Sequence, residues 1–287
     1  MPNPNDTWAD FRAAWEETET LPAEVLEVCR AILSGASAPG LEQLREERGK
    51  RTFRAEIYSG AATGKFVVKE FGPRGPVDAL FLRHLRPGPG RRYPHAAAAI
   101  REAGVLTPVV RFVALYDGPD GPRYLIGAEQ IEGTRMLGEI LTGLPAQERA
   151  GLFQTVGQAV ARLHRAGLFH FDLNEDNLLF CGVSSCLTGP HLVDLDYTVR
   201  VPLKRRRLCR VLARLDLHQF FTTRSVDLSK EDRRMFEEGY RCAGGYAHYA
   251  DWRFIPPRRR YPRWKRQVGT SLIHLFRGAL LVCRLVR

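Results

Sequence analysis

Three polar residues in the second half of the chain have the types and the order that phosphoryl transfer from ATP requires. Asp172 and Asn177 lie five residues apart, and Asp194 follows after a short interval. This chemistry needs a carboxylate near the attacking hydroxyl and two oxygen ligands that hold Mg²⁺ against the phosphates. The five-residue spacing lets one loop supply both a base and a metal ligand, and Asp194 completes the set from a second segment.

A simpler interpretation of the loop is that its polar residues only cap turns. Asp172, Asp176 and Asn177 are of the types that usually do so. The complete set of three, in this order, favours the catalytic interpretation. We interpret His170 as structural, because the histidine of such a loop organises it through hydrogen bonds.

The neighbouring elements must deliver these residues to one place. Leu192–Val193 follows the turn-forming residues Thr188–Pro190 and is predicted to be a short buried strand that carries Asp194. A long amphipathic helix is predicted over residues 148–166, and Gly167 closes it just before the loop.

A β-hairpin is predicted earlier in the chain, from Thr52–Tyr58, a turn, and Lys65–Phe71. Lys69 follows two valines, as does the kinase lysine that contacts the α- and β-phosphates of ATP. The alternative interpretation is that Lys69 is an ordinary exposed lysine on a strand, without a role in binding phosphate. In the preceding turn, residues 46–52, only Gly49 allows a close approach of backbone to phosphate.

Two further segments bear on nucleotide binding. Kinases place the glutamate that pairs with the strand lysine in a helix that is predicted here over residues 91–103. The only acid of this helix, Glu102, lies in its last turn, so the partner of the lysine stays unassigned. Tyr124–Gly133 is predicted as a strand running into a linker, where backbone groups of Glu129 and Ile131 would bind adenine.

With these motifs the chain resembles the bacterial lipopolysaccharide core kinases, which include the Kdo kinases and the inner-core heptose kinases and have a protein-kinase-like fold. The resemblance covers roughly residues 41–241. It rests on the strand Phe66–Lys69, the helix end Gly104–Pro108, the loop His170–Leu179, and the turn Val193–Asp196 with the arginines after it. In the loop, Leu173–Asn174 replaces the Leu-Lys of protein kinases, which favours the sugar-kinase branch.

The resemblance implies a role for each matching residue. Asp172 would be the catalytic base, Asn177 and Asp194 the ligands of Mg²⁺, and Lys69 the residue that holds the phosphates of ATP. The implied activity is that of an ATP-dependent kinase acting on a sugar hydroxyl, of Kdo or heptose, in the lipopolysaccharide inner core.

The acceptor is expected to be small or lipid-linked. Only about ten residues separate Asp194 from a helix predicted over 205–221, and the Ala-Pro-Glu anchor of protein kinases is not found. Arg205, Arg206 and Arg207 are expected to orient an anionic sugar or glycolipid acceptor through paired hydrogen bonds.

These features together predict an α+β, bilobal protein-kinase-like fold with an N-terminal helical extension and a basic C-terminal helix. The predicted parts are the extension (1–40), a β-rich nucleotide-binding lobe (41–131), a helical catalytic lobe (132–255) and the basic amphipathic tail (256–287). The extension is expected to begin with a capping box of Thr7 and Asp10.

The net charge of +11 is concentrated in two segments. Seven basic and no acidic residues lie between Tyr197 and Leu215, and ten basic and no acidic residues between Trp252 and Arg287. Removing these 17 charges from +11 leaves −6 for the rest of the chain. Either these are solvated arginines on ordinary helices, or they meet an anionic partner, such as a membrane surface reached by the tail. Nucleic acid is disfavoured, because no nucleic-acid motif accompanies the arginines.

No secretory signal and no membrane-spanning segment is predicted, so the protein is expected in the cytoplasm or at the cytoplasmic face of the inner membrane. The six cysteines form no C-x-x-C pair and are interpreted as reduced thiols. Two other functions stay open: a kinase-fold phosphotransferase with another small-molecule or protein acceptor, and a nucleotide-binding pseudokinase scaffold.

Overall fold

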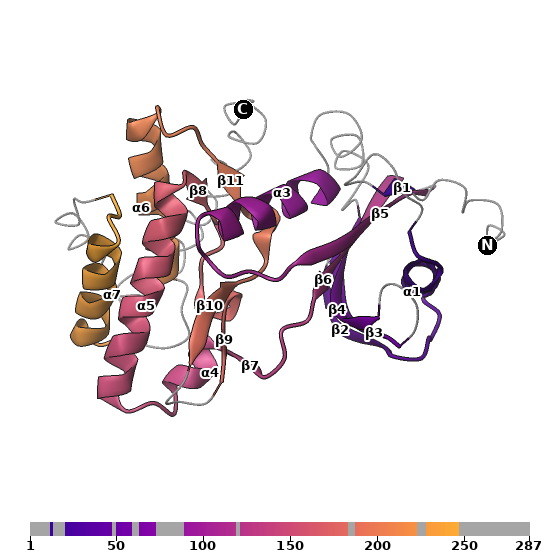
Figure 1. Ribbon diagram of the computed structural model, residues 1–287, viewed down its shortest axis with the longest axis horizontal. Coiled ribbons are helices and arrows are strands. Elements are labelled where there is room, and N and C mark those ends of the chain that lie inside the picture. The colour runs from indigo at the N-terminus through magenta and orange to yellow at the C-terminus, as the bar shows by residue number, and fades with distance from the viewer. Residues whose placement is uncertain are drawn as a thin grey trace, which may run out of the picture. The chain divides into compact units, whose positions relative to one another are not determined.

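The computed structural model divides the chain into two compact units (Figure 1). Unit 1 comprises residues 1–97 and 108–130, and unit 2 comprises residues 98–107 and 131–287. The residues whose structure is described are 12–13, 21–47, 50–58, 63–72, 89–118, 121–182, 187–222 and 228–246. The predicted capping box of Thr7 and Asp10, Gly49, and the tail 256–287 lie outside this part of the chain.

Unit 1 is built on a six-stranded antiparallel sheet in the order β1-β5-β6-β4-β3-β2. Its strands are β1 (Arg12–Ala13), β2 (Leu41–Glu47), β3 (Lys50–Ile57), β4 (Gly64–Phe71), β5 (Val110–Gly118) and β6 (Gly121–Glu129). Buried residues alternate along most of β3 and β4, as expected where one face of a strand packs on a core. That face packs against buried residues of helix α1 (Ala23–Ser34), which recur at helical spacing: Val25, Val28, Cys29 and Ile32.

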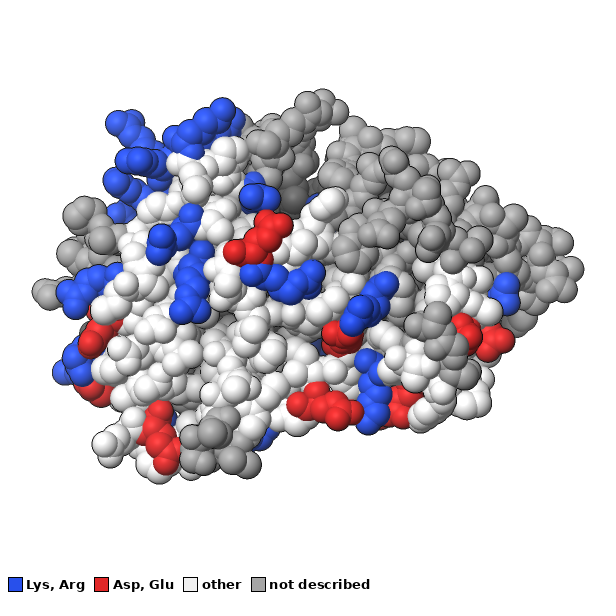
Figure 2. All heavy atoms as spheres, in the orientation of Figure 1, with Lys and Arg blue, Asp and Glu red and all other residues white. Residues whose placement is uncertain are grey.

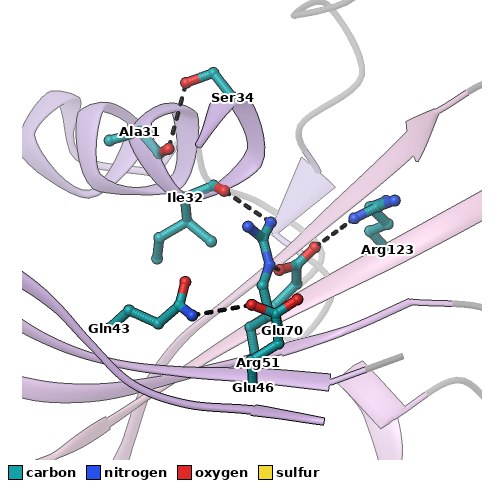
Figure 3. Close-up of polar contacts among 8 residues, drawn as sticks. All are labelled: Ala31, Ile32, Ser34, Gln43, Glu46, Arg51, Glu70 and Arg123. Carbon is teal, nitrogen blue, oxygen red and sulfur yellow. Dashed lines mark hydrogen bonds and ion pairs between the residues drawn. The ribbon is translucent and has the colours of Figure 1, made fainter. Parts of the chain in front are cut away.

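A buried carboxylate fastens α1 to the sheet (Figure 3). Glu70 of β4 is 2% exposed, and its two oxygens bind Arg51 of β3 at 2.5 Å and Arg123 of β6 at 2.7 Å. Arg51 also donates to the carbonyl of Ile32, in the last turn of α1, at 2.9 Å. Because successive strand residues point to opposite faces, Lys69 projects from the other side of the sheet. Glu70 is therefore a structural carboxylate and is not positioned to pair with that lysine.

Unit 1 confirms the predicted hairpin and corrects part of the predicted helical extension. β3 and β4 pair antiparallel, with Thr52 opposite Lys69. Arg12–Ala13, expected in a helix, instead forms β1 and pairs with β5. This pairing satisfies backbone groups that the edge of the sheet would otherwise leave unpaired. Helix α3 (Pro89–Glu102), which begins in unit 1 and ends in unit 2, confirms the helix predicted over 91–103.

Unit 2 contains helices α4 (Leu137–Leu141), α5 (Ala146–Arg165), α6 (Arg206–Thr222) and α7 (Lys230–Cys242). A three-stranded sheet in the order β10-β9-β7 is formed by β7 (Thr134–Met136), β9 (Leu178–Cys181) and β10 (Thr188–Leu192). β8 (Leu168–Phe169) pairs with β11 (Val199–Arg200). Helices α5 and α6 confirm the two helices predicted in this region. Within the described residues, no helix has the length and apolar character needed to cross a membrane.

Residues Thr188–Pro190, predicted as a turn, belong to β10 instead. The register between β10 and β9 shifts between Thr188 and His191, and Gly189 adopts a φ of +141° there. A glycine inside a strand often marks such an irregularity, because it tolerates backbone conformations that other residues avoid. The turn-forming residue types at Thr188–Pro190 therefore mark a local irregularity within β10, and not a turn that precedes the strand.

Two glycines let α5 and α7 approach backbone to backbone. A Cβ added to Gly239 of α7 would lie 2.0 Å from the carbonyl oxygen of Gln154, and one added to Gly157 of α5 would lie 2.2 Å from that of Phe236. Backbone atoms cannot rotate away as a flexible side chain can, so any larger residue at these positions forces the helices apart.

We expect Gly239→Ala to lower the free energy of unfolding by about 3 kcal/mol, because overpacking outweighs the helix propensity that alanine adds. Gly151→Ala on α5 is the matched control. No heavy atom lies within 4 Å of its added Cβ, so this change should raise stability by roughly 0.5–1 kcal/mol. Urea denaturation measures both, and equal stability of the two variants would contradict the close packing.

Candidate active site

The loop of residues 170–177 in unit 2 is held in shape by Asn174. Its side-chain oxygen accepts from the backbone N–H of Asp176 at 2.9 Å and of Asn177 at 3.1 Å, which caps the short 3₁₀ helix η2 (Glu175–Asn177). Its amide donates to the carbonyl of Asp172 at 3.1 Å. Asn174 therefore performs the capping that the simpler interpretation assigned to its neighbours, and the turn does not need the carboxylate of Asp172.

Amide groups hold both oxygens of the Asp172 carboxylate. The Nδ2 of Asn177 donates to Oδ2 at 3.3 Å and also to the backbone carbonyl of Asp172 at 2.7 Å. The Nε2 of Gln219, which is 8% exposed on α6, donates to Oδ1 at 2.8 Å. Asp172 itself is half-buried. The carboxylate is thus fixed in one orientation by two donors from different elements.

His170 joins this loop to the segment that carries Asp194. Its Nε2 lies 2.9 Å from the carbonyl oxygen of Val193, and its Nδ1 lies 3.3 Å from the backbone N–H of Asp172. Because a carbonyl can only accept, Nε2 donates and Nδ1 accepts. The N–H of Val193 in turn donates to the carbonyl of Asn177 at 3.1 Å. Val193, the residue before Asp194, is therefore hydrogen-bonded to the loop through both its carbonyl and its N–H. This agrees with the interpretation of His170 as a structural residue.

A fully buried carboxylate, Asp216 of α6, holds the beginning of the loop. It accepts from the backbone N–H groups of His170 and Phe171, both at 2.7 Å, and from Nε2 of His164 at 3.2 Å. Burial by itself would raise the pKa of Asp216. The hydrogen bond from His164, the attraction of His164 and His170, and the backbone N–H of His170 together hold that pKa below its ordinary value. Asp216 is therefore an anion that anchors the loop.

Two backbone conformations within the site are uncommon for residues with a side chain. Phe171 and Asp194 each have a φ of +58°, the left-handed region, and no other non-glycine residue in the described part of the chain has a positive φ. Such conformations persist only where the surroundings enforce them, and they concentrate at functional sites. At Phe171 the backbone N–H donates to Asp216, and the side chain is buried.

Sequence reasoning missed Asp216 and Gln219, although a signal for them exists. They lie three residues apart in α6, on the face that also carries the buried residues Leu212, Leu217 and Phe220. A carboxylate and an amide on the apolar face of a helix must be hydrogen-bonded, because burying a polar group without a partner is costly. That pattern indicates a polar contact to another element, but it does not say which one.

The predicted nucleotide-binding residues are divided between the units. In unit 1, the Nζ of Lys69 lies 5.8 Å from the centre of the Tyr93 ring. Glu129 donates its N–H to the carbonyl of Val109 at 2.8 Å, and its side chain pairs with Arg111 at 2.7 Å. Ile131 begins the second segment of unit 2. Binding of adenine by Glu129 and Ile131 and of phosphate by Lys69 stays a prediction.

The structure does not place the predicted acceptor arginines beside Asp172. Arg205–Arg207 lies at the N-terminal end of α6, whereas Gln219, which contacts Asp172, lies near its C-terminal end. At 1.5 Å per residue, the two are separated by roughly 18–21 Å along the helix. This distance exceeds the length of an arginine side chain, and the orientation of an anionic acceptor by Arg205–Arg207 stays a prediction.

One protein family matches residues 91–240, which run from α3 to α7 and include the whole loop; it is described as the lipopolysaccharide kinase (Kdo/WaaP) family. The chain belongs to this family. The resemblance drawn from the motifs is thereby confirmed.

Individual relatives match shorter parts of the chain. A 3-deoxy-D-manno-octulosonic acid kinase of Stenotrophomonas maltophilia K279a is 34% identical over 155 residues, which are 50% of this chain and 56% of that protein. The KEOPS complex subunit Bud32 of Pyrococcus abyssi is 37% identical over 83 residues, 28% of this chain and 37% of that protein. The chain thus spans about half, or less, of the length of these curated relatives.

A solved structure titled "WaaP in complex with acyl carrier protein" resembles the chain with a TM-score of 0.50 at 19% identity. The likeness covers 88% of this chain and 97% of that one. At this identity it shows the fold, and the predicted α+β protein-kinase-like class is confirmed.

Proposed function

We propose that this Kdo/WaaP family protein transfers the γ-phosphoryl group of ATP to a hydroxyl of Kdo or heptose in the lipopolysaccharide inner core. The observation that carries the proposal is the loop geometry. Asp172 is fixed by Asn177 and Gln219, and Asp194 follows a residue that is hydrogen-bonded to the same loop. Kdo kinases among the relatives support a sugar acceptor.

Asp172 is assigned as the group that accepts the proton of the attacking sugar hydroxyl. In such transfers the protein acts mainly by positioning and by stabilising charge, so a carboxylate of fixed orientation suits the task. The side-chain amides of Asn177 and Gln219 orient the Asp172 carboxylate by donating to it, and neither side chain is itself an acid. Lys69 is assigned to the phosphates, and backbone groups near Gly49, Glu129 and Ile131 to the rest of the nucleotide.

Asn177 and Asp194 fit a Mg²⁺ ion by the chemistry of their oxygens. Mg²⁺ takes oxygen ligands and is usually bound through one or two carboxylates together with substrate phosphates. The Nδ2 of Asn177 is turned to Asp172, which leaves its Oδ1 as the ligand atom, and the Asp194 carboxylate is half-buried. When bound, the ion would neutralise charge on the phosphates. Within the described residues, no group of three or more His, Cys, Asp and Glu side chains forms a metal cluster.

The acceptor is an anionic glycolipid in this proposal, which places the protein at the cytoplasmic face of the inner membrane. The decisive experiment incubates the purified protein with ATP and Mg²⁺ and either Kdo-lipid A or its heptosylated form. Mass spectrometry of the products locates the added phosphate on Kdo or on heptose. Binding of ATP without transfer to either acceptor would refute the sugar-kinase proposal and favour a scaffold or another acceptor.

Gln219 provides a separate test of how Asp172 is positioned. We expect Gln219→Met, which keeps the side-chain length but removes the donor, to lower kcat by about 10- to 100-fold through misplaced geometry. The KM for ATP should change little, which separates positioning from loss of structure. Gln43→Met is the control, because Gln43 donates to the Glu46 carboxylate on an exposed strand at 3.1 Å. An unchanged kcat in Gln219→Met would remove Gln219 from the site.

A further inference from the structure

One face of α6 and of the turn before it gathers cations and exposed aliphatic side chains. We call it the basic face; its members are Leu203, Lys204, Arg205, Arg206, Arg207, Arg210 and Val211, all of them exposed. Leu203 is 51% exposed and Val211 is 44% exposed. Figure 2 shows the blue side chains gathered on unit 2 where α6 begins.

The basic face lies mainly on α6, whose opposite side packs into the core of unit 2. The opposite side of α6 carries the fully buried residues Cys209, Leu212 and Ala213, which pack with Phe169 and Phe171. No acidic residue lies between Tyr197 and Leu215, and the next acid along α6, Asp216, is fully buried. The charges within this segment are therefore all of one sign and are carried by a helix that packs on the core.

Two exposed arginines on other elements differ from this arrangement. Arg54 pairs with Glu42 at 2.7 Å, and Arg234 pairs with Glu231 at 2.7 Å. Both lie on elements where acids and bases alternate. The concentration of like charge on α6 favours an anionic partner, because binding one would relieve the repulsion between these charges.

The separation of these arginines from Gln219 along α6 argues against the reacting sugar as that partner. Arg205–Arg210 lies roughly 14–21 Å along α6 from Gln219, so these arginines are placed to contact something other than the group that receives phosphate. The two aliphatic residues decide against a purely phosphate-lined partner such as nucleic acid, where Leu203 and Val211 would stay in water. A lipid surface offers phosphates to the arginines and an apolar layer just beneath to Leu203 and Val211.

We propose that the basic face of α6 docks the protein on an anionic membrane surface. The arginines bind lipid phosphates, and Leu203 and Val211 enter the headgroup layer between them. This surface differs from the C-terminal basic tail, and docking does not depend on the phosphoryl-transfer proposal, because it requires no ATP. On a membrane, the roughly 14–21 Å along α6 between the arginines and Gln219, which contacts Asp172, would set how far from the lipid phosphates a glycan can be reached.

The test uses the full chain and vesicles of phosphatidylcholine alone or mixed equally with phosphatidylglycerol, read by co-sedimentation. Wild type should bind only the anionic vesicles. Arg206→Gln/Arg207→Gln/Arg210→Gln should bind about 100-fold more weakly, since each basic residue near an anionic surface contributes about fivefold. The control Arg54→Gln/Arg111→Gln/Arg234→Gln removes the same charge elsewhere and should bind much more strongly than the α6 variant.

A second variant, Leu203→Ser/Val211→Ser, keeps every charge and should still bind several-fold more weakly than wild type. Thermal melting of each variant checks that it folds. Two results would overturn the proposal. Unchanged binding of the α6 arginine variant would assign membrane contact to another basic segment, such as residues 252–287. Binding of RNA or of an acidic protein, without binding of anionic vesicles, would show that the face serves a different partner.

Discussion

Asp172→Asn is expected to lower kcat for phosphoryl transfer by about 10³-fold, within the range that a positioned general base contributes. Asparagine keeps the size of the side chain but cannot accept the proton of the attacking hydroxyl. Its amide would also face the donor groups of Asn177 or Gln219, so the orientation seen here would be lost. Initial rates at saturating ATP measure the effect.

The control for this change is Asp176→Asn. Asp176 lies in the same loop and is exposed, and it contributes only its backbone N–H to the turn. Its replacement should leave kcat within about twofold of wild type, as is usual for surface changes of small energetic effect. Equal activity of Asp172→Asn and Asp176→Asn would exclude Asp172 as the base.

Asp216→Asn is expected to lower the free energy of unfolding by about 2–4 kcal/mol and to reduce activity as well. The carboxylate accepts from two backbone N–H groups and from His164, whereas asparagine supplies one acceptor oxygen and an amide that would face a donor. One buried donor is then left without a partner. Chemical denaturation measures the loss, and a variant as stable as wild type would show that the loop does not depend on this anchor.

The pH dependence of that loss has a predictable sign. The pKa of Asp216 in the folded protein is held below its ordinary value of 3.8, so the unfolded chain binds the proton more readily. The stabilisation by Asp216 is therefore complete above about pH 4, and it is lost as the pH falls through the folded pKa. The difference in stability between wild type and Asp216→Asn should shrink below pH 4, and a difference that grows there would contradict the assignment of Asp216 as an anion.

Local sequence was sufficient for much of the fold. The hairpin of β3 and β4 follows from β-forming residues on either side of a glycine-containing turn, and α5 and α6 follow from apolar residues at helical spacing. The predictions were wrong where strand pairing between distant parts of the chain outweighed local sequence preference. Arg12–Ala13 forms a strand because it pairs with β5. Thr188–Pro190 lies in β10, which pairs with β9, although its residues are typical of turns.

By itself the sequence determined the family, the fold class and the candidate trio of Asp172, Asn177 and Asp194. The five-residue spacing of Asp172 and Asn177 within one loop is a local property of the sequence. Other kinases carry the same motif because phosphoryl transfer needs the same residue types. The division of the chain at residues 40, 131 and 255 stays a prediction.

Only the tertiary structure revealed how the candidate base is held. Gln219 lies 47 residues from Asp172 and Asp216 lies 46 residues from His170, yet each is hydrogen-bonded to the loop. The structure also shows that Arg205–Arg207 lies at the start of α6, far along the helix from Gln219, and the role of these arginines in binding an acceptor stays a prediction. The physical reason is the same in both cases: residue types limit which contacts a side chain makes, but the packing of α6 decides which partners lie within a hydrogen bond of it.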